Sequence, residues 1–277
     1  MINKLLETNL FKSKKSKNRE LISIENKFCE KLGISNVIIQ NGIKNFLYAM
    51  EFNKLFQIWP PFIRNDPKLS ILGALTFSLY PQYQYFIIAE NKLIGYASTV
   101  PVLTRPEIKD LPDEGYTWAI QSSLRNFFYT KNTVSALAAV VDPELQGQGL
   151  SKLMIELLKT IAIIHGFSRL IVPVRPTLKS KFPKESIDKY IERVRDDKLP
   201  FDPWLRAHAK SGGKILNICH KSMVIKASLN KWNNWTQKTL TTGKHQIDGA
   251  LVPITIDIES REGSYIEPNV WVSYTTT

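Results

Sequence analysis

The residues best suited to chemistry are two closely spaced glycines, Gly147 and Gly149, which stand just before a predicted helix. Glycine lets the backbone turn tightly and approach a ligand without a Cβ in the way. The unpaired N–H groups at the start of a helix, together with the helix dipole, attract anions such as phosphate. The segment from Asp142 to Ser151 is therefore a candidate binding loop for a pyrophosphate group.

Two common phosphate-binding motifs do not fit this loop. A P-loop requires glycine, lysine and then serine or threonine, whereas here Lys152 follows Ser151. A dinucleotide-binding loop requires a third glycine where the chain has Lys152, and an acidic residue about 20 residues further on. The segment 166–175 contains Arg169 and Arg175 and no acidic residue. The alternative to a binding loop is a purely structural strand-to-helix turn that has no ligand.

The residues around the loop predict the elements that hold it in place. Val134–Val141 is a nearly continuous apolar run, typical of a fully buried strand. After the loop, apolar residues recur with the spacing of an amphipathic helix that ends at Gly166, and Arg169–Val174 predicts the next strand. The apolar helix residues are Leu150, Leu153, Met154, Leu157, Leu158, Ile161 and Ile164.

Upstream of the loop, the pattern predicts two helices, a hairpin and an insertion. Asp66 and Pro67 form a plausible helix cap and first-turn proline. Residues 104–131 are longer and more aromatic than a plain connection requires, which indicates an insertion over one face. The predicted elements are helices over 43–56 and 69–79, strands over 83–89 and 93–102, and a short helix over 118–127.

Downstream, a basic, proline-rich region leads into short strands and a final hairpin. Two alternating runs face each other across Arg261–Gly263, and this hairpin would suit dimerisation or a lid over the site. The predicted elements are helices over 186–196 and 203–210, strands over 215–218 and 223–225, a helix around Trp232 and Trp235, and strands over 250–258 and 265–274.

Composition and charge restrict the functions further. The 277 residues are 43% hydrophobic, which supports a folded core and excludes disorder of the whole chain. The net charge is +12, and segment 168–228 holds 14 basic and 6 acidic residues, which favours anionic partners. Neither the two cysteines, Cys29 and Cys219, nor the four histidines have the spacing of a metal site, so no metal is expected.

The loop resembles motif A of the GNAT superfamily, the acetyl-CoA-dependent acetyltransferases. The motif runs Val-x-Pro-x-x-[Gln/Arg]-x-x-Gly-x-[Gly/Ala]. Gln146 and Gly149 stand at its diagnostic positions, while Ser151 replaces the usual Gly or Ala. The resemblance implies a mixed α/β (α+β) fold, with a central, mostly antiparallel β-sheet flanked by helices. It divides the chain into a basic N-terminal extension (1–35), a GNAT acyltransferase domain (36–228) and a C-terminal extension with a β-hairpin (229–277).

The resemblance also implies the co-substrate and its binding residues. Acetyl-CoA or another acyl-CoA is expected. The strand backbone at Ala139, Val140 and Val141 is expected to pair with the pantetheine arm, and an N–H there to polarise the thioester carbonyl. The pyrophosphate is expected on the N–H groups of Gln146, Gly147, Gln148, Gly149, Leu150 and Ser151.

Two residues are candidates for the proton transfers. The family's usual proton donor is a tyrosine four residues before a Gly-Phe pair. Counting back from Gly212 gives His208, and counting from Gly213 gives Ala209. Histidine suits the role because its usual pKa is close to neutral. We take Glu114 as the candidate base. Asp113, Tyr116, Asp142, Asp202 or a relayed water are the alternatives, and Arg175 is a candidate contact for substrate or co-substrate.

The leading interpretation is a GNAT-type N-acetyltransferase, in which an amine of a small molecule or peptide attacks the thioester directly. Two alternatives stay open: transfer to the thiol of an acidic acyl carrier protein, and a non-catalytic acyl-CoA-binding protein. Nucleic-acid binding is a minor option, because no recognised binding signature is present. The sequence shows neither a signal peptide nor a membrane span, so we expect a cytoplasmic protein, with a homodimer as one option.

Overall fold

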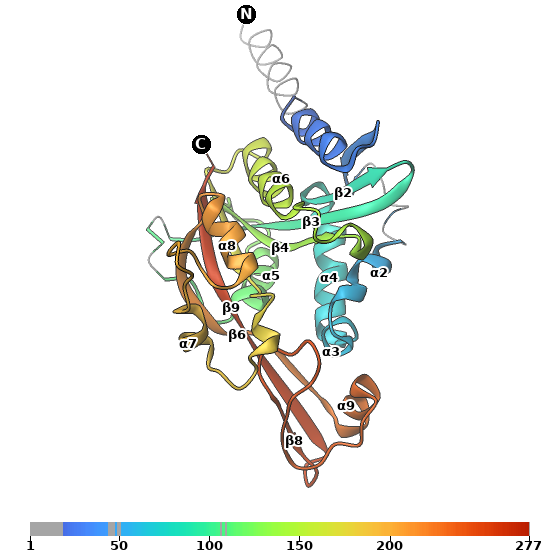
Figure 1. The fold of residues 1–277 in the computed structure, drawn as a ribbon, viewed down its shortest axis with the longest axis vertical. Coiled ribbons are helices and arrows are strands. Elements are labelled where there is room, and N and C mark those ends of the chain that lie inside the picture. The colour runs from blue at the N-terminus through green and yellow to red at the C-terminus, as the bar shows by residue number, and fades with distance from the viewer. Residues whose placement is uncertain (1–18, 44–47, 49–50, 106, 109, 277) are drawn as a thin grey trace, which may run out of the picture.

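A nine-stranded sheet forms the centre of the part of the chain that the structure describes (Figure 1). The structure is a computed structural model that describes residues 19–43, 48, 51–105, 107–108 and 110–276. The strand order is β1-β2-β3-β4-β5-β9-β8-β7, with β6 paired to β9. The pairing is antiparallel except between β4 and β5. The strands are β1 (Val37–Asn41), β2 (Gln84–Ala89), β3 (Lys92–Val102), β4 (Thr133–Val141), β5 (Arg169–Val174), β6 (Lys214–Ser228), β7 (Gly243–His245), β8 (Ile254–Asp257) and β9 (Glu262–Thr275).

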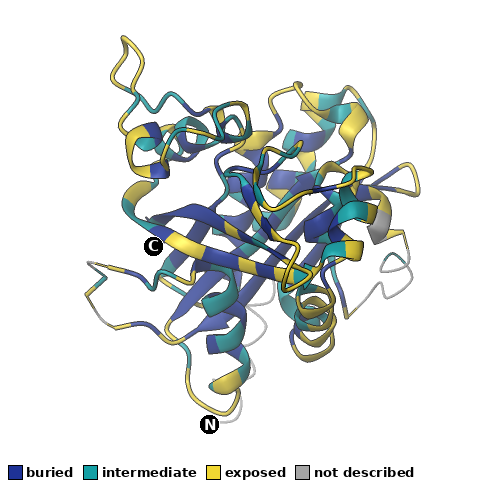
Figure 2. Cartoon of the chain, turned by 90° about the horizontal axis from the view of Figure 1, so that it is seen from below, coloured by how far each residue is buried: buried dark blue, intermediate teal, exposed yellow. Residues whose placement is uncertain are grey.

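Helices cover both faces of the sheet, which is largely buried between them (Figure 2). A helix over 19–32 lies beside α6 on one face, and α5 lies on the other (Figure 1). Helix α8 packs beside α6, with Leu205 in the same core, and α9 lies in the C-terminal part (Figure 1). The helices are α2 (Phe52–Leu55), α3 (Pro61–Arg64), α4 (Pro67–Leu79), α5 (Gly115–Arg125), α6 (Ser151–Ile164), α7 (Ile187–Ile191), α8 (Pro203–Lys210) and α9 (Leu229–Thr236).

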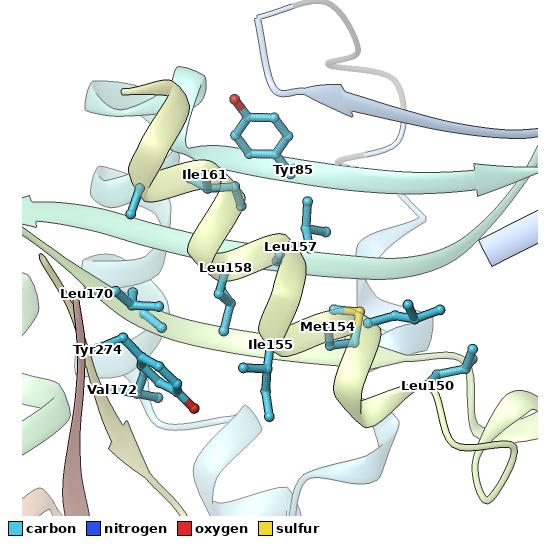
Figure 3. Close-up of a cluster of buried hydrophobic side chains, with 14 of the residues drawn as sticks. Tyr85, Leu150, Met154, Ile155, Leu157, Leu158, Ile161, Leu170, Val172 and Tyr274 are labelled. Carbon is cyan, nitrogen blue, oxygen red and sulfur yellow. The ribbon is translucent and has the colours of Figure 1, made fainter. Parts of the chain in front are cut away.

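The amphipathic helix α6 packs its apolar side onto the sheet and forms the largest part of the core (Figure 3). Leu158 of α6 lies over β5, where Leu170 and Val172 point toward the helix. Ile171, between them, belongs to the separate cluster under α5, together with Trp271 of β9. Alternate residues of β5 therefore serve opposite faces, as the two-residue period of a strand requires.

Most of the local predictions are confirmed. Asp66 caps α4 by accepting a hydrogen bond from the N–H of Leu69 at 2.8 Å, and Pro67 is the first helical residue. Glu90 and Asn91 both have positive φ in the tight turn between β2 and β3. The mixed, mostly antiparallel sheet with flanking helices is the predicted fold class. None of the described helices is both long and apolar enough to cross a lipid bilayer.

The prediction of two short strands over 215–218 and 223–225 is wrong, because β6 is one long strand. Its pairing with β9 shifts register twice, between Ile215 and Ile218 and between Cys219 and Met223. These irregularities interrupt the alternation of apolar residues without ending the strand. Polar residues at these irregularities hold the insertion: Asn217 accepts a hydrogen bond from the N–H of Leu111, and Ser222 accepts one from the N–H of Tyr116.

Two predicted helices differ in length from those observed. The helix expected over 186–196 ends at Ile191, because the chain turns back there and pairs Val194 with Pro200. The helix expected over 43–56 falls partly on residues outside the described ones, and α2 occupies its end.

The two segments predicted as extensions both pack against the central sheet. Ile24 and Phe28, from the segment predicted as an extension, are fully buried in the α6 core. At the other end, β9 lies between β5 and β6, so a boundary at residue 228 cuts through the sheet. Helix α9 and strand β8 do project from the body of the fold (Figure 1), but the sheet is completed only by the last strand.

Candidate active site

A large cavity lies at the point where β4 and β5 separate. The two strands pair in parallel only at Val134 and Ser135 of β4, which face Leu170 and Ile171 of β5. Beyond these pairs, residues 136–141 of β4 border the cavity. The cavity has a volume of about 1170 Å³, and α3, α4, the start of α6, the end of β5 and part of the C-terminal segment complete its walls.

The edge of β4 that faces the cavity has no strand partner from Ala136 to Val141 among the described residues. The opposite edge is occupied by β3, with an irregularity where Leu137 is the extra residue. An unpaired strand edge offers N–H and C=O groups to an extended ligand. Ala139, Val140 and Val141, predicted to pair with a pantetheine arm, therefore lie on an edge that can do so.

The glycine loop connects this edge to α6. Gly147 and Gly149 have φ of +80° and +75°, values that glycine adopts without strain. In the described part of the chain, the backbone hydrogen bonds of the loop stop at the N–H of Gln146 and resume at that of Met154. Helix α6 has neither a side-chain cap nor an acidic residue in its first turn. The positive end of the helix and the N–H groups from Gly147 to Ser151 are thus available to an anion, which fits a pyrophosphate. The N–H of Gln146, also predicted to bind the pyrophosphate, instead donates to the carbonyl of Pro143.

The loop residues differ in their position relative to the cavity. Gln146, Gly147, Leu150 and Ser151 line it. Gln148 and Gly149 are exposed in the same loop.

His208 does not line the cavity. It lies in α8 with 0% of its surface exposed, its Nδ1 is 2.7 Å from the hydroxyl of Tyr274, and its ring packs on Trp204. Burial lowers the pKa of His208 to about 3, so its imidazole is neutral at physiological pH. Trp204, on which the ring of His208 packs, does line the cavity. The predicted role of His208 as proton donor stays a prediction.

Glu114 also lies outside the cavity, because it is an exposed residue immediately before α5. Its predicted role as base stays a prediction. Tyr116, two residues later, does line the cavity. Burial raises the pKa of Tyr116 to about 12, so this hydroxyl is protonated at neutral pH and suits a donor better than a base.

One wall of the cavity carries hydroxyl groups held by a buried glutamine. The hydroxyls of Tyr96 and Ser98 donate to Oε1 of Gln84, at 2.7 and 2.6 Å. The amide of Gln84 donates in turn to the carbonyl oxygens of Tyr80 and Thr99. Since the proton of Ser98 is directed to Gln84, its oxygen faces the cavity as a hydrogen-bond acceptor.

A second polar wall contains an ion pair between β5 and β9. Nε of Arg175 lies 3.0 and 3.1 Å from the two carboxylate oxygens of Glu267, and Nη2 donates to the carbonyl of Gly249 at 2.6 Å. Tyr265 donates to the same carboxylate at 2.7 Å. Burial lowers the pKa of Arg175, but the facing carboxylate of Glu267 and Tyr265 together raise it above its usual value, so Arg175 stays charged. Asn269 lines the cavity beside this pair.

Sequence reasoning identified Arg175 but missed the residues around it. Glu267 and Asn269 are about 90 residues away in the chain, in a segment predicted to be an extension, and only the pairing of β5 with β9 brings them together. The sequence did not indicate that Gln84, Tyr96 and Ser98 belong to the site, because isolated polar residues are common in strands. No group of three or more His, Cys, Asp or Glu side chains in the described residues is arranged to hold a metal ion.

The comparisons with known proteins agree with this geometry. No family model matches the chain. The arginine N-acetyltransferase avaD of Aspergillus versicolor is 34% identical over 246 residues, covering 78% of this chain and 84% of that protein.

Two solved structures share the fold. The loading GNATL domain of CurA from Lyngbya majuscula superposes with a TM-score of 0.54 at 18% identity, covering 87% of this chain and 98% of that one. The GphF GNAT-like decarboxylase in complex with isobutyryl-CoA superposes with a TM-score of 0.52 at 12% identity, covering 88% of this chain and 100% of that one. The chain belongs to the GNAT superfamily and is an acyl-CoA-dependent N-acetyltransferase.

Proposed function

We propose that this acetyltransferase acylates the amine of a small molecule of amino-acid size, with arginine as the first candidate. The observation that carries the proposal is the cavity beside the unpaired β4 edge. Its volume of about 1170 Å³ slightly exceeds the roughly 300–1,000 Å³ typical of single-ligand pockets, which leaves room for an acyl-pantetheine arm and a small acceptor. The similarity to an arginine N-acetyltransferase supports an amino-acid acceptor.

In this proposal the backbone binds the co-substrate. The N–H groups from Gly147 to Ser151 hold the pyrophosphate, and residues 136–141 of β4 pair with the extended arm. Bound acyl-CoA supplies the activated acyl group. A β4 N–H directed at the thioester carbonyl polarises it, a role in which preorganised donors lower the barrier. The protein thereby contributes mainly position and fixed dipoles.

In the same proposal, side chains that line the cavity orient the amine and donate a proton to the leaving group. The oxygen of Ser98 accepts a hydrogen bond from the acceptor amine and orients its lone pair toward the β4 edge. The described residues that line the cavity include no Asp or Glu, so we assign removal of the amine proton to water. As the new N–C bond forms and the C–S bond breaks, the protonated Tyr116 donates its proton to the departing sulfur.

Acetyl transfer from acetyl-CoA across an amine panel tests this function. The panel contains arginine, other amino acids, a polyamine, a short peptide and a phosphopantetheinylated acyl carrier protein. We expect stoichiometric release of CoA and an N-acetylated amino acid identified by mass spectrometry. Transfer to the carrier protein thiol and to none of the amines would replace this proposal with the carrier-protein alternative. Titration calorimetry with CoA checks separately that the co-substrate binds.

A further inference from the structure

The second polar wall of the cavity contains donor side chains around an ion pair that is already formed. Glu267 is fully buried in this wall, and both its oxygens accept hydrogen bonds, from Arg175 and Tyr265. Arg175 also donates from Nη2 to the carbonyl of Gly249. The buried carboxylate of this wall is therefore already engaged by donors of the protein itself.

The side-chain amide of Asn269 adds a donor that has no hydrogen-bond partner among the described residues. Its side chain is 1% exposed, lines the cavity, and its Nδ2 is buried with no hydrogen-bond partner among the described residues. It stands two residues after Glu267 on β9, so both side chains lie on the same face of the strand. A buried amide without a partner is unfavourable and uncommon in folded proteins, and it points to a ligand that supplies the acceptor.

Arg64 brings a second cation to the lining of the cavity. Its Nε is buried without a partner in the described part of the chain, and the residue lines the cavity. The backbone N–H of Arg64 donates to the carbonyl of Pro60 at 3.1 Å. Pro60 in turn touches Gly249, where a Cβ would lie only 2.6 Å from its ring. Gly249 also accepts from Arg175, so these contacts link the backbone of Arg64 to the guanidinium of Arg175.

We propose that Arg64, Arg175 and Asn269, here called the donor wall, bind the carboxylate of the acceptor. A carboxylate offers two acceptor oxygens and a negative charge, which the donor wall lacks and the lining of the described cavity does not supply from Asp or Glu. The acceptor is then an amino acid rather than a simple amine or polyamine. The inference rests on the proposed function, because the carboxylate is placed opposite the β4 edge so that the amine faces the acyl group.

Matched acceptors test the donor wall. We expect the wild-type kcat/KM for L-arginine to exceed that for L-argininamide and agmatine at least tenfold. In Asn269→Ala and in Arg64→Gln, KM for arginine rises about tenfold, the values for the two carboxylate-free amines hardly change, and the Kd of CoA stays constant. Asn230→Ala, an exposed residue of α9, is the control.

The outcomes separate the failure of this inference from failure of the proposed function. Equal wild-type rates on arginine and argininamide would overturn the carboxylate subsite while leaving the enzyme an N-acetyltransferase of small amines. Preference for an aminophosphonate over the amino acid would also overturn it, in favour of a phosphonate acceptor. Absence of turnover on every amine would instead count against the proposed function. Arg64→Gln keeps the test informative if Asn269→Ala does not fold.

A different observation concerns the outer end of the glycine loop. The helix over 19–32 ends beside it, and the Nζ of Lys31 lies 3.5 Å from the point that a Cβ on Gly149 would occupy. Lys31 is exposed and has no carboxylate within ion-pair distance among the described residues, whereas Lys27, one turn earlier, pairs with Glu156. We infer that Lys31, from outside the region that resembles motif A, binds a phosphate of the co-substrate.

Binding measurements with and without phosphates test this role. In Lys31→Ala, we expect the Kd of CoA to rise about tenfold at low salt and the difference from wild type to shrink as salt increases. Binding of acetyl-pantetheine, which has no phosphate, stays unchanged. Lys226→Ala, an exposed lysine on β6, is the control. An unchanged Kd of CoA in Lys31→Ala would overturn the inference.

Discussion

Arg175 and Glu267 form an ion pair at 3.0 Å that ties the end of β5 to the last strand, β9. The side chain of Glu267 is 0% exposed, whereas that of Arg175 is 24% exposed and lines the cavity. The pair thus has two consequences. It fixes the position of Arg175 in the acceptor part of the cavity, and it makes the C-terminal strand part of the site.

Removing one partner of this pair leaves an uncompensated buried charge. We expect Glu267→Ala to lower the free energy of unfolding by about 3–5 kcal/mol, and the double variant Glu267→Leu with Arg175→Met to lower it by much less. Urea titration followed by circular dichroism measures both. Equal losses in the single and double variants would show that the pair contributes through packing rather than charge.

The buried His208 makes stability depend on pH. Its pKa is lowered to about 3 in the folded state from 6.5, so below about pH 6.5 the unfolded chain binds a proton that the folded chain does not. The stability is therefore complete above this pH and falls by about 1.4 kcal/mol per pH unit as the pH drops toward 3. Urea titrations between pH 4 and 8 measure the slope, and His208→Gln should reduce it.

The same variant distinguishes a structural from a catalytic His208. Because the residue does not line the cavity, we expect His208→Gln to keep kcat within a few-fold at pH 7.5. A loss of kcat beyond a hundredfold in a variant that is folded and binds CoA would support its predicted role as proton donor.

Tyr116 is expected to matter for turnover and not for binding. Loss of a positioned acid typically costs 10²–10⁴-fold, and water can replace part of it, so we expect kcat of Tyr116→Phe to fall about a hundredfold. The Kd of CoA and the melting temperature should stay close to wild type. Glu114→Gln, which changes an exposed residue two positions away, is the matched control and should keep full kcat. The reverse pattern would assign the chemistry to Glu114.

Gly149 and Gly166 offer a matched pair of glycines. Both have positive φ, at +75° and +80°, and each should cost about 1 kcal/mol of stability when changed to alanine. Only Gly149 lies in the phosphate loop, so we expect Gly149→Ala alone to weaken CoA binding. Calorimetry of the two variants provides the comparison, and equal affinities would argue against the loop as the pyrophosphate site.

The sequence predicted what depends on neighbours in the chain. Asp66 and Pro67 start a helix by a local hydrogen bond and a fixed φ. The two glycines of the loop indicate a tight turn before α6. Both features were therefore visible without a structure. So was the amphipathic face of α6, whose period is set by helix geometry.

The rest of the site depends on contacts between distant residues. Asn269 belongs to the cavity only because β9 pairs with both β5 and β6, and no local pattern indicates that pairing. The burial of His208 depends on Tyr274 and Trp204 packing around it, so counting residues from Gly212 found the helix position but not its environment. The two register shifts hid the continuity of β6 for the same reason.

A crystal structure with CoA and L-arginine bound tests the central claim most directly. The account predicts the pantetheine arm along residues 136–141 of β4, the pyrophosphate on the loop from Gly147 to Ser151, and the arginine carboxylate within hydrogen-bond distance of Asn269. Arginine bound with its carboxylate in solvent, or outside the cavity between β4 and β5, would contradict it.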